Sequence, residues 1–507
     1  MIWESATGGK FFMEFRSFEN KLEEFALLLL MKLHKNILIA IVPAMILFAC
    51  TDDDSFTISP DHQLSFSTDT LKLDTTFSNV PTAAKSFWMY NFSGDGIRCS
   101  NVRLERGNQS GFRVNIDGVY LGKETGYQTG GIEIRNKDSV RVFVELTSAY
   151  TRKEVPQKIE DNLIITLESG RIQKVNLNAY SWDADVIRSL KVKNDTVISS
   201  TKPIIVYGGI TIDSAATLKI GEGTVLYFHH DAGIDVYGKL LTEGTPSKNV
   251  VLRGDRLDRL FPYLPYDRVS GQWQGIRFRT SSYDNRLAYT DIHSTFNGVQ
   301  ADSSDVARTT LTLDACTIHN CQGYGLISTE SKVVLCNSQF TNTLQDCVFI
   351  DGGNVVINGC TMAQFYPFDS KRGVAFRCSA LKPLQAMNCT NTLITGYADD
   401  ELLITRKKDG PPVDYLFDHC VIRTPKITTA DSLKFVSVDY ENVKDTVKYG
   451  RKHFVKIDAD KFSYDFRLDS VSSAINKASV TTSLPTDRSG TTRDNKPDIG
   501  AFEYIKQ

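Results

Sequence analysis

Similar six-residue segments recur between residues 289 and 425, and this repeat limits the possible folds more than any other feature. The segments read YTDIHS, CTIHNC, SQFTNT, CTMAQF, TLITGY and CVIRTP. They align on large apolar residues that lie 26, 22, 22, 32 and 28 positions apart, namely Ile292, Ile318, Phe340, Met362, Ile394 and Ile422. A repeat of this length indicates a chain that winds in stacked coils, each burying its apolar residue against the next.

A second strand follows in most coils, and glycine stands at many of the corners, as in "GVQ", "GLIS" and "GVAF". Equivalent positions of stacked parallel strands lie about 4.8 Å apart, and side chains alternate between the two faces. The six apolar residues should therefore form one column inside the stack. The sequence predicts an all-β chain with a right-handed parallel β-helix over residues 202–430.

Small residues precede the apolar column by two positions, at Thr290, Cys316, Ser338, Cys360, Thr392 and Cys420. Cys316, Cys360 and Cys420 then lie on alternate coils, about 9 to 10 Å apart, which is beyond the reach of a disulfide bond. We therefore expect buried free thiols that pack as small apolar side chains.

Residues 64–183 show a different pattern, with short strands that alternate apolar and polar residues, as in "VRVFVEL" at 140–146. Such a series over about 120 residues is typical of a β-sandwich. The segments "TAAKSFWMYN" and "KDSVRVFVEL" resemble the immunoglobulin-like domains related to Hydin and to spindle-associated proteins. This resemblance implies a spacer or docking domain.

A short basic start and an apolar core occupy residues 31–49, which is the pattern of a signal peptide. The ending "LFAC" resembles a bacterial lipobox, so Cys50 would carry the lipid and residues 50–63 would form a tether. The alternative is a chance cysteine in an uncleaved helix. Residues 1–30 precede this signal and indicate an upstream choice of start codon.

The acidic run "TDDD" after Cys50 resembles the surface-export tag of Bacteroidetes lipoproteins. This resemblance implies a protein that is anchored by lipid in the outer membrane and exposed at the cell surface. The formal net charge is −2, so the chain lacks the basic field of a nucleic-acid-binding protein. We expect a monomer whose partners are the membrane, through the lipid, and a polysaccharide.

The tail carries "DFRLDSVSSAIN" and "DRSGTTRDNKPDIGAFEY", which resemble the end of the choice-of-anchor Q family found on bacterial β-helix proteins. The open end of a β-helix exposes unpaired strand edges. We therefore expect residues 431–507 to be a C-terminal cap of the β-helix.

The coil pattern is similar to that of the pectate-lyase-like superfamily, which brings polysaccharide lyases and glycoside hydrolases into view. A lyase needs a cation and a base. Asp399, Asp400 and Glu401 are the candidate ligands for Ca²⁺, and Arg406, Lys407 and Lys408 are the candidate bases. The alternative is a solvated corner loop without catalysis.

Two histidines should stack on the outside of adjacent coils, because His293 and His319 each follow an apolar core residue. Asp291 lies two residues before the first of them. The pair could bind a metal ion or a sugar, or it could be a surface ladder. Trp273 is a further candidate, either as a platform for a sugar ring or as an aromatic cover of the β-helix flank.

These observations predict a surface lipoprotein that presents a β-helix for glycan association or adhesion without catalysis and without a required cofactor. The alternative is a lyase or hydrolase that acts on glycans containing uronic acid and uses Ca²⁺. A cleft with clustered acidic and basic side chains on one sheet would favour the enzyme.

Overall fold

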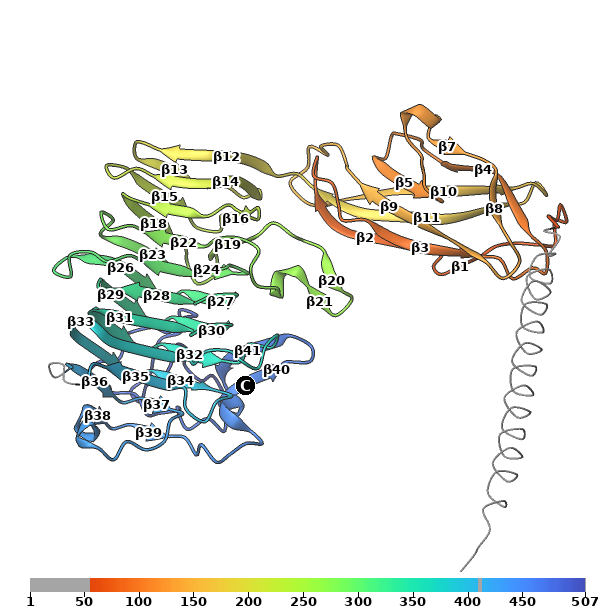
Figure 1. Cartoon of the computed structure of the whole chain (residues 1–507). Helices are drawn as coiled ribbons and strands as arrows, with labels where there is room; N and C mark the ends of the chain where they lie inside the picture. The colour runs from red at the N-terminus through yellow and green to blue at the C-terminus, as the bar shows by residue number, and fades with distance from the viewer. Residues whose placement is uncertain (1–54, 409–412, 507) are drawn as a thin grey trace, which may run out of the picture.

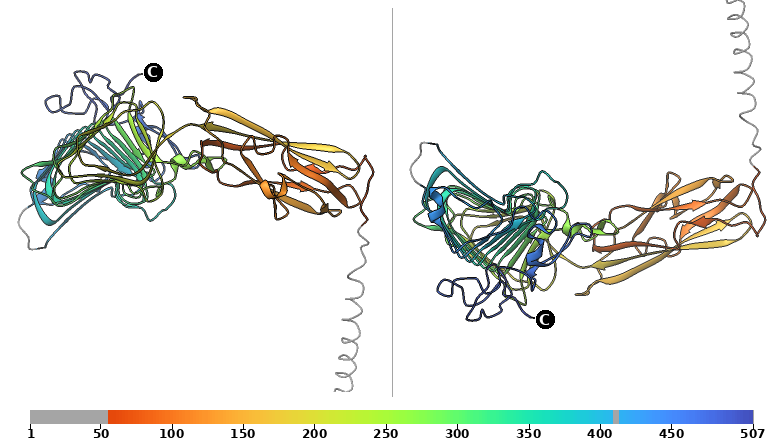
Figure 2. Two further views of the ribbon diagram at one scale, coloured as in Figure 1. Left: turned by 90° about the horizontal axis from the view of Figure 1, so that it is seen from above. Right: turned by 90° about the horizontal axis from the view of Figure 1, so that it is seen from below.

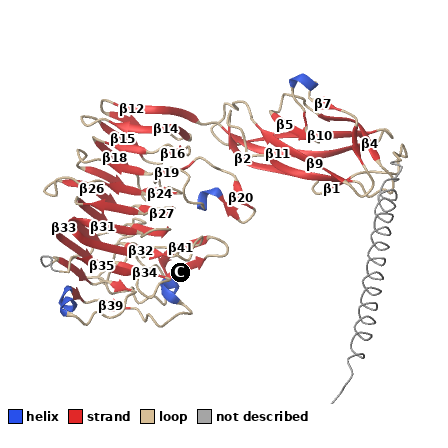
Figure 3. Ribbon diagram, in the orientation of Figure 1, coloured by secondary structure: helices blue, strands red, loops and turns tan. Residues whose placement is uncertain are grey.

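The computed structural model describes residues 55–408 and 413–506, and nearly all regular elements in this part of the chain are strands (Figure 3). Four short 3-10 turns are the other elements: η1 (Lys123–Thr125), η2 (Tyr266–Arg268), η3 (Ala430–Lys434) and η4 (Tyr449–His453). The expected all-β class is confirmed. Within the described ranges, no helix has the length and apolar character needed to cross a membrane. The predicted signal peptide, Cys50 and the acidic run at 52–54 lie outside the described residues.

The N-terminal part is a sandwich of two sheets. One sheet has the order β1 (Ser65–Phe66), β3 (Lys85–Tyr90), β9 (Ser139–Leu146), β5 (Phe112–Ile116) and β6 (Val119–Tyr120). The other has the order β2 (Thr70–Phe77), β11 (Ile172–Trp182), β10 (Gln157–Leu167), β4 (Ile97–Leu104) and β7 (Gln128–Thr129), with β8 (Ile132–Ile134) also paired to β4. Alternate residues such as Val140, Val142 and Val144 are buried between the sheets, as the alternating sequence predicts.

The remainder is a right-handed parallel β-helix, in which 26 strands are linked by parallel pairing (Figure 1). Its first strands are β12 (Asp185–Val192), β13 (Thr196–Ile198) and β14 (Ile204–Ile212), so parallel pairing begins before residue 202. From there each coil crosses three faces in turn, which we name A, B and C. The coils enclose one apolar core.

Face A contains β16 (Val225–Phe228), β19 (Val250–Gly254), β24 (Thr290–His293), β27 (Thr317–Cys321), β30 (Gln339–Thr343), β32 (Thr361–Gln364), β34 (Leu393–Gly396), β37 (Val421–Ile422) and β39 (Asp439–Tyr440). Face B contains β17 (Ile234–Val236), β22 (Ile276–Phe278), β25 (Val299–Ala301), β28 (Leu326–Thr329), the first part of β31 (Val348–Asn358), the first part of β33 (Phe376–Thr390) and β35 (Leu402–Arg406). Face C contains β15 (Thr217–Gly221), β18 (Lys239–Glu243), β23 (Asn285–Ala288), β26 (Thr309–Asp314), β29 (Lys332–Cys336), the later parts of β31 and β33, β36 (Tyr415–Asp418) and β38 (Phe435–Val436).

The predicted apolar column is present on face A. Each member is paired with the next in register, and all of them are fully buried: Ile292, Ile318, Phe340, Met362, Ile394 and Ile422. The cysteines of the neighbouring column, Cys316, Cys360 and Cys420, are buried free thiols, as expected. The alignment of the six segments on these residues therefore gives the true register of the coils.

The sandwich and the β-helix meet in a small apolar cluster. The Phe77 ring lies 4.9 Å from the Tyr227 ring, and Ala184 and Ile205 complete the buried set. Only Asp183 and Ala184 connect β11 to β12, so the linker itself is part of this contact. The two parts lie side by side near the first coils (Figure 1).

The first residues of the expected cap add β38 and β39 to the stack. The rest of it, residues 449–506, which we call the tail, lies along the side of the β-helix, outside the stacked coils in both end-on views (Figure 2). Outward residues Ala363, Leu393 and Val421 of face A pack against it, together with the hairpin of β40 (Phe454–Asp458) and β41 (Ser463–Leu468). The tail therefore covers part of face A, whereas the sequence led us to expect it over the open end. The apolar character of these outward positions explains the difference, because exposed apolar patches favour a cover.

Candidate functional site

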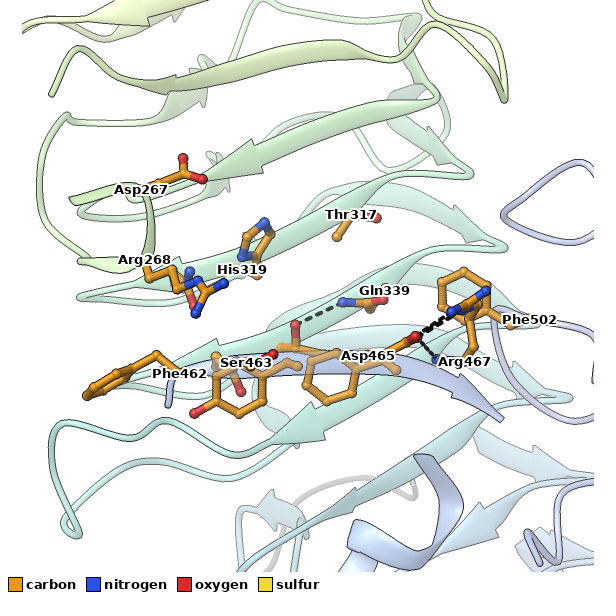
Figure 4. A pocket seen from close by; sticks show the side chains of 15 residues that line it. Asp267, Arg268, Thr317, His319, Gln339, Phe462, Ser463, Asp465, Arg467 and Phe502 are labelled. Carbon is orange, nitrogen blue, oxygen red and sulfur yellow. Dashed lines mark hydrogen bonds and ion pairs between the residues drawn. The ribbon is translucent and has the colours of Figure 1, made fainter. Parts of the chain in front are cut away.

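A cleft opens on face A beside the part that the tail covers, and its volume is about 390 Å³. Its floor is the polar outer surface of β27 and β30, and its walls come from the insertion between β19 and β22 and from the β40–β41 hairpin (Figure 4). The lining residues are mostly polar: Asp267, Arg268, Thr317, His319, Asn320, Gln339, Thr341, Asn342, Ser463, Asp465 and Arg467, with Phe462, Tyr464, Phe466 and Phe502.

The pairing register of β27 and β30 determines which side chains form the floor of the cleft. Thr317 pairs with Gln339, and His319 pairs with Thr341, so these outward side chains form two short ladders. Asn320 and Asn342 follow at the strand ends with φ values of 54° and 56°. Asparagine tolerates this left-handed backbone region better than most residues. The coil geometry thus places amide and hydroxyl groups side by side at the bottom of the cleft.

A cluster of two histidines and two aspartates occupies the upper edge of the cleft. The rings of His293 and His319 stack with centroids 4.7 Å apart. Asp291 Oδ1 lies 2.6 Å from His293 Nδ1 and 3.3 Å from His319 Nε2. The insertion adds Asp267, whose Oδ1 lies 2.8 Å from His293 Nε2 and 2.7 Å from Arg253 Nη1. Both nitrogens of the buried His293 ring are therefore held by carboxylates.

The carboxylates determine the protonation of this cluster. Burial alone would lower the pKa of His293, but the charge of Asp291 and the hydrogen bonds with Asp267 and Asp291 raise it to about 9. Burial would raise the pKa of Asp267, yet His293 and Arg253 hold it well below its ordinary value. The pKa of Asp291 is likewise well below its ordinary value, because the charges of the two histidines outweigh burial. Both aspartates are anions at neutral pH.

Asp465 and Arg467 on β41 form the opposite wall, and their side chains are joined by an ion pair (Figure 4). The hydrogen bonds from Arg467 lower the pKa of Asp465. This carboxylate is therefore also ionised at neutral pH.

A row of aromatic rings borders the cleft, and we call Phe261, Tyr263, Phe462 and Phe368 the aromatic row. Neighbouring rings stack with centroids 5.6, 6.1 and 5.0 Å apart. Phe261 and Tyr263 come from the insertion, which contains β20 (Arg259–Phe261) and β21 (Leu264–Pro265), and Phe462 comes from the β40–β41 turn. Phe261, Tyr263 and Phe368 are exposed, so the row presents ring surface to solvent.

The structure stacks His293 on His319, as the repeat alignment predicts, and adds Asp291 and Asp267 as partners. The pair is not a simple surface ladder, because His293 is buried beneath the insertion. Whether the pair binds a ligand stays a prediction.

Trp273 cannot serve as a sugar platform, because its side chain is fully buried in the β-helix core. Its ring stacks on Phe228 at 4.2 Å, and its Nε1 donates a hydrogen bond to the His293 carbonyl at 2.8 Å. Trp273 instead supports the backbone beneath the histidine pair.

The candidate calcium ligands Asp399, Asp400 and Glu401 interact with different partners in the structure. Glu401 is buried and accepts hydrogen bonds from the Ala375 and Ala398 backbone, and burial raises its pKa well above the ordinary value. Asp400 accepts a hydrogen bond from Thr424 at 2.7 Å. Asp399 is exposed, 3.5 Å from Arg423. In the described ranges, the one group of three with the spacing of metal ligands is Asp291, His293 and His319.

The candidate bases are not placed around those carboxylates either. Arg406 ends β35 on face B and is paired with Asp431 at 3.1 Å. Lys407 and Lys408 follow it and are exposed. The candidate lyase centre in "ADDELLITRKK", the alternative to a solvated corner loop, is thus not assembled in the structure.

Sequence reasoning missed the insertion and the hairpin as walls of the cleft. Asp267 lies 24 residues before Asp291, in a loop without a repeat, so its place over face A depends on the folded path of the loop. A usable signal was the cluster of aromatic residues in "RLFPYLPY", which is unusual for a surface loop.

No protein-family model matches the chain, and no curated protein matches it. Solved structures are similar to parts of it. A protein of unknown function from Porphyromonas gingivalis W83 is 12% identical with a TM-score of 0.18, and the match covers 26% of this chain and 50% of that one. The chain thus matches about half the length of that protein.

Two further structures are similar to different shares of the chain. The catalytic unit of a thermostable GH87 α-1,3-glucanase from Streptomyces thermodiastaticus strain HF3-3 is 8% identical with a TM-score of 0.26, and the match covers 70% of this chain and 89% of that one. The ASH/PapD-like domain 7 of human CEP192 is 10% identical with a TM-score of 0.17, and the match covers 25% of this chain and 91% of that one.

Proposed function

We propose that the protein is a lipid-anchored surface protein that binds a polysaccharide in the face A cleft and does not cleave it. The observation that carries the proposal is that a polar surface and an aromatic surface adjoin each other at the face A cleft. An amide- and hydroxyl-lined floor lies directly beside the exposed aromatic row.

Polysaccharides suit this combination for a chemical reason. Sugar rings offer hydroxyl groups, which exchange hydrogen bonds with partly exposed side chains of the cleft such as His319 and Asp465, and apolar C–H faces, which pack on aromatic rings. Ligand sites commonly join apolar or aromatic contact area with a few fixed polar groups. The aromatic row also continues past the cleft, which favours an extended chain over a small molecule.

The cleft holds clustered acidic and basic side chains, which is the feature that favours an enzyme, but the protonation of its carboxylates argues against a glycosidase. A glycosidase of the usual two-carboxylate type needs one carboxyl group with a raised pKa as general acid. Asp267 and Asp465, the carboxylates that line the cleft, both have lowered pKa values. The hydrolase alternative therefore lacks a proton donor of this kind among the cleft carboxylates. A lyase would need a base and a cation instead, so the assay for unsaturated product decides against or for it.

Display at the surface is the second half of the proposal. The lipobox-like "LFAC" provides Cys50 for acylation and anchoring in the outer membrane. The described chain begins at the end of the sandwich that is remote from the β-helix (Figure 1). A lipid upstream of that point would let the sandwich act as a stalk that holds the cleft away from the membrane.

The proposal is tested with the full chain, purified in mild detergent, on a panel of neutral and uronic-acid polysaccharides. Binding is measured by affinity electrophoresis, and cleavage by unsaturated-product absorbance and reducing-end release. We expect retardation by at least one polysaccharide with no product. Product formation would make the protein an enzyme, and a panel without any binding would contradict the proposal.

The variant Tyr263→Ala tests whether the polysaccharide binds at the aromatic row. Loss of one stacked ring removes about 1 kcal/mol or more, so we expect roughly a tenfold loss of affinity for the polysaccharide. Tyr150→Ala is the matched control, because Tyr150 is 55% exposed on the sandwich and Tyr263 is 57% exposed. An equal loss in both variants would place the binding surface elsewhere.

A further inference from the structure

We propose that Asp291, His293 and His319 form a binding site for a divalent transition metal ion of the zinc type at the edge of the face A cleft. One ligand atom from each of the three side chains lies within 4.8 Å of the others. The site lies beside the proposed polysaccharide cleft, but the inference does not depend on polysaccharide binding.

The ligand atoms have nearly the spacing that such an ion requires. Two ligands of one tetrahedral zinc ion lie about 3.3 Å apart, since the metal–ligand bonds are about 2.0 Å long. His319 Nε2 and Asp291 Oδ1 are already 3.3 Å apart. His293 Nδ1 and Asp291 Oδ1, now 2.6 Å apart, need to separate by less than about 1 Å for an ion to enter.

The other contacts of the His293 ring would hold it in the orientation that a metal ligand needs. An ion at Nδ1 displaces the proton that Nδ1 shares with Asp291, and this proton leaves to solvent, while Nε2 keeps its proton and donates a hydrogen bond to Asp267, 2.8 Å away. A carboxylate behind a ligating imidazole fixes the ring and its tautomer. Arg253 pairs with the same Asp267 oxygen at 2.7 Å and balances its charge. Ring stacking on His319 adds a further restraint on the orientation.

The fold makes the site stiff on one side and open on the other. Asp291, His293 and His319 stand on the adjacent strands β24 and β27, paired in register, so their backbones cannot shift independently. His293 is buried, whereas 30% of the Asp291 side chain and 25% of the His319 side chain are exposed. His319 also lines the cleft. Three protein ligands thus leave a fourth position toward the cleft for water or a ligand oxygen, as in open zinc sites.

The ligand types identify the class of metal. Two imidazole nitrogens and one carboxylate suit Zn²⁺ and its transition-metal neighbours, whereas Ca²⁺ and Mg²⁺ prefer sites made of oxygen alone. The predicted selectivity is therefore for Zn²⁺ and Co²⁺ over Ca²⁺, unlike that of the candidate calcium ligands around Asp399.

The test uses the full chain in detergent, stripped with a chelator and titrated calorimetrically with Zn²⁺, Co²⁺ and Ca²⁺. We expect one Zn²⁺ per chain, visible absorption typical of tetrahedral Co²⁺, and no heat from Ca²⁺. No Zn²⁺ binding by the wild-type chain would mean that the cluster is a hydrogen-bonded histidine–aspartate network only, and would overturn the inference.

Variants separate this site from any other. His319→Ala and Asp291→Asn should remove Zn²⁺ binding, and Asp267→Asn should weaken it by about 10- to 100-fold through the orientation of His293. His230→Ala is the control, because His230 is an exposed histidine that also pairs with an aspartate, Asp231. Unchanged Zn²⁺ affinity in His319→Ala would contradict the assignment.

Thermal melting of each metal-free variant checks its folding, and Zn²⁺ should raise the melting temperature of the wild-type chain but not of His319→Ala. No polysaccharide is present in these assays. Zn²⁺ binding without polysaccharide binding would support the metal site and contradict the proposed function. Polysaccharide binding without Zn²⁺ binding would support the proposed function and contradict the metal site.

Discussion

Asp183 shows how a single residue can fix the relation between the two parts of the molecule. It stands in the linker between β11 and β12, and its buried carboxylate accepts hydrogen bonds from Ser78 at 2.5 Å and from the backbone N–H groups of Thr151 and Arg152 at 2.9 and 2.6 Å. A buried carboxylate with several donors is stabilised in its charged form. The linker is thereby tied to the sandwich just before the β-helix begins.

Replacing Asp183 with alanine should lower the free energy of unfolding of the sandwich by about 1 to 3 kcal/mol, because three donors lose their acceptor. Urea denaturation followed by tryptophan fluorescence, to which Trp88 and Trp182 of the sandwich contribute, measures the loss. Asp185→Ala is the control, since Asp185 is exposed two residues later. Equal stability of the two variants would contradict this role of Asp183.

The Asp183 contribution should also depend on pH. Burial alone would raise the pKa of Asp183, but the hydrogen bonds from Ser78, Thr151 and Arg152 hold it below the ordinary value of 3.8. A carboxylate whose pKa is lower in the folded state stabilises the fold above its unfolded pKa, and this stability is lost as the pH falls through the folded value. The difference between wild type and Asp183→Ala should therefore be constant near neutral pH and shrink below pH 3.8.

Single residues also show which features of the structure could be predicted from the sequence. Ile292 and Ile318 were predictable because their spacing repeats, and the stacking of His293 on His319 followed from the same register. The burial of Trp273 was not predictable, since it depends on how the insertion of residues 255–275 folds back over the coil.

At the scale of elements, residues 469–506 of the tail show how a segment without regular strands docks on the β-helix. Arg493 is almost fully buried and donates to the carbonyls of Asp498 and Gly500, to Asn337 on the corner after β29, and to Glu503 at 3.0 Å. Asn358 and Asn391, on equivalent corners, bind Thr482 of the tail. The corner asparagines of successive coils thus form a docking strip for the tail.

Arg493→Ala should destabilise the docked tail by about 3 to 5 kcal/mol, because it leaves the nearly buried Glu503 without its charged partner. Limited proteolysis should then cut between residues 470 and 507 much faster than in wild type. Lys496→Ala, a change of an exposed residue of the same segment, should leave the cleavage rate unchanged. Full protease resistance of Arg493→Ala would show that the strip does not hold the tail.

The lateral position of the tail could have been inferred from a change along face A. Outward positions on β24, β27 and β30 are polar, with Asp291, Thr317 and Gln339 in one column, and the same column becomes apolar at Leu393 and Val421. Such a change marks the edge of a covered surface. The family resemblance of the tail alone pointed to the open end of the stack.

At the scale of the whole molecule, the sandwich and the β-helix are joined by a short linker and a small apolar contact around Phe77 and Tyr227. The described chain starts at the far end of the sandwich, and the face A cleft lies on the β-helix (Figure 1). This order agrees with the proposed path from lipid to stalk to binding surface.

Cys50→Ser should release the protein from membranes, because the proposed anchor is a lipid on that sulfur and a serine cannot take its place. Fractionation of cells of a Bacteroidetes host, with a salt wash of the membranes, measures the effect. The matched control is Cys99→Ser, a change of a buried cysteine of the sandwich that should keep the protein in the membrane fraction. Membrane retention of Cys50→Ser after the wash would contradict the lipobox interpretation.

The central claim is that a polysaccharide binds in the face A cleft, and hydrogen exchange of the full chain with and without a bound polysaccharide tests it most directly. We predict slower exchange in residues 259–265, 317–342 and 462–467, which form the walls and floor of the cleft. The sandwich offers a competing hollow of about 880 Å³ around Tyr120 and Tyr127. Protection confined to that hollow, with unchanged exchange on face A, would contradict the account.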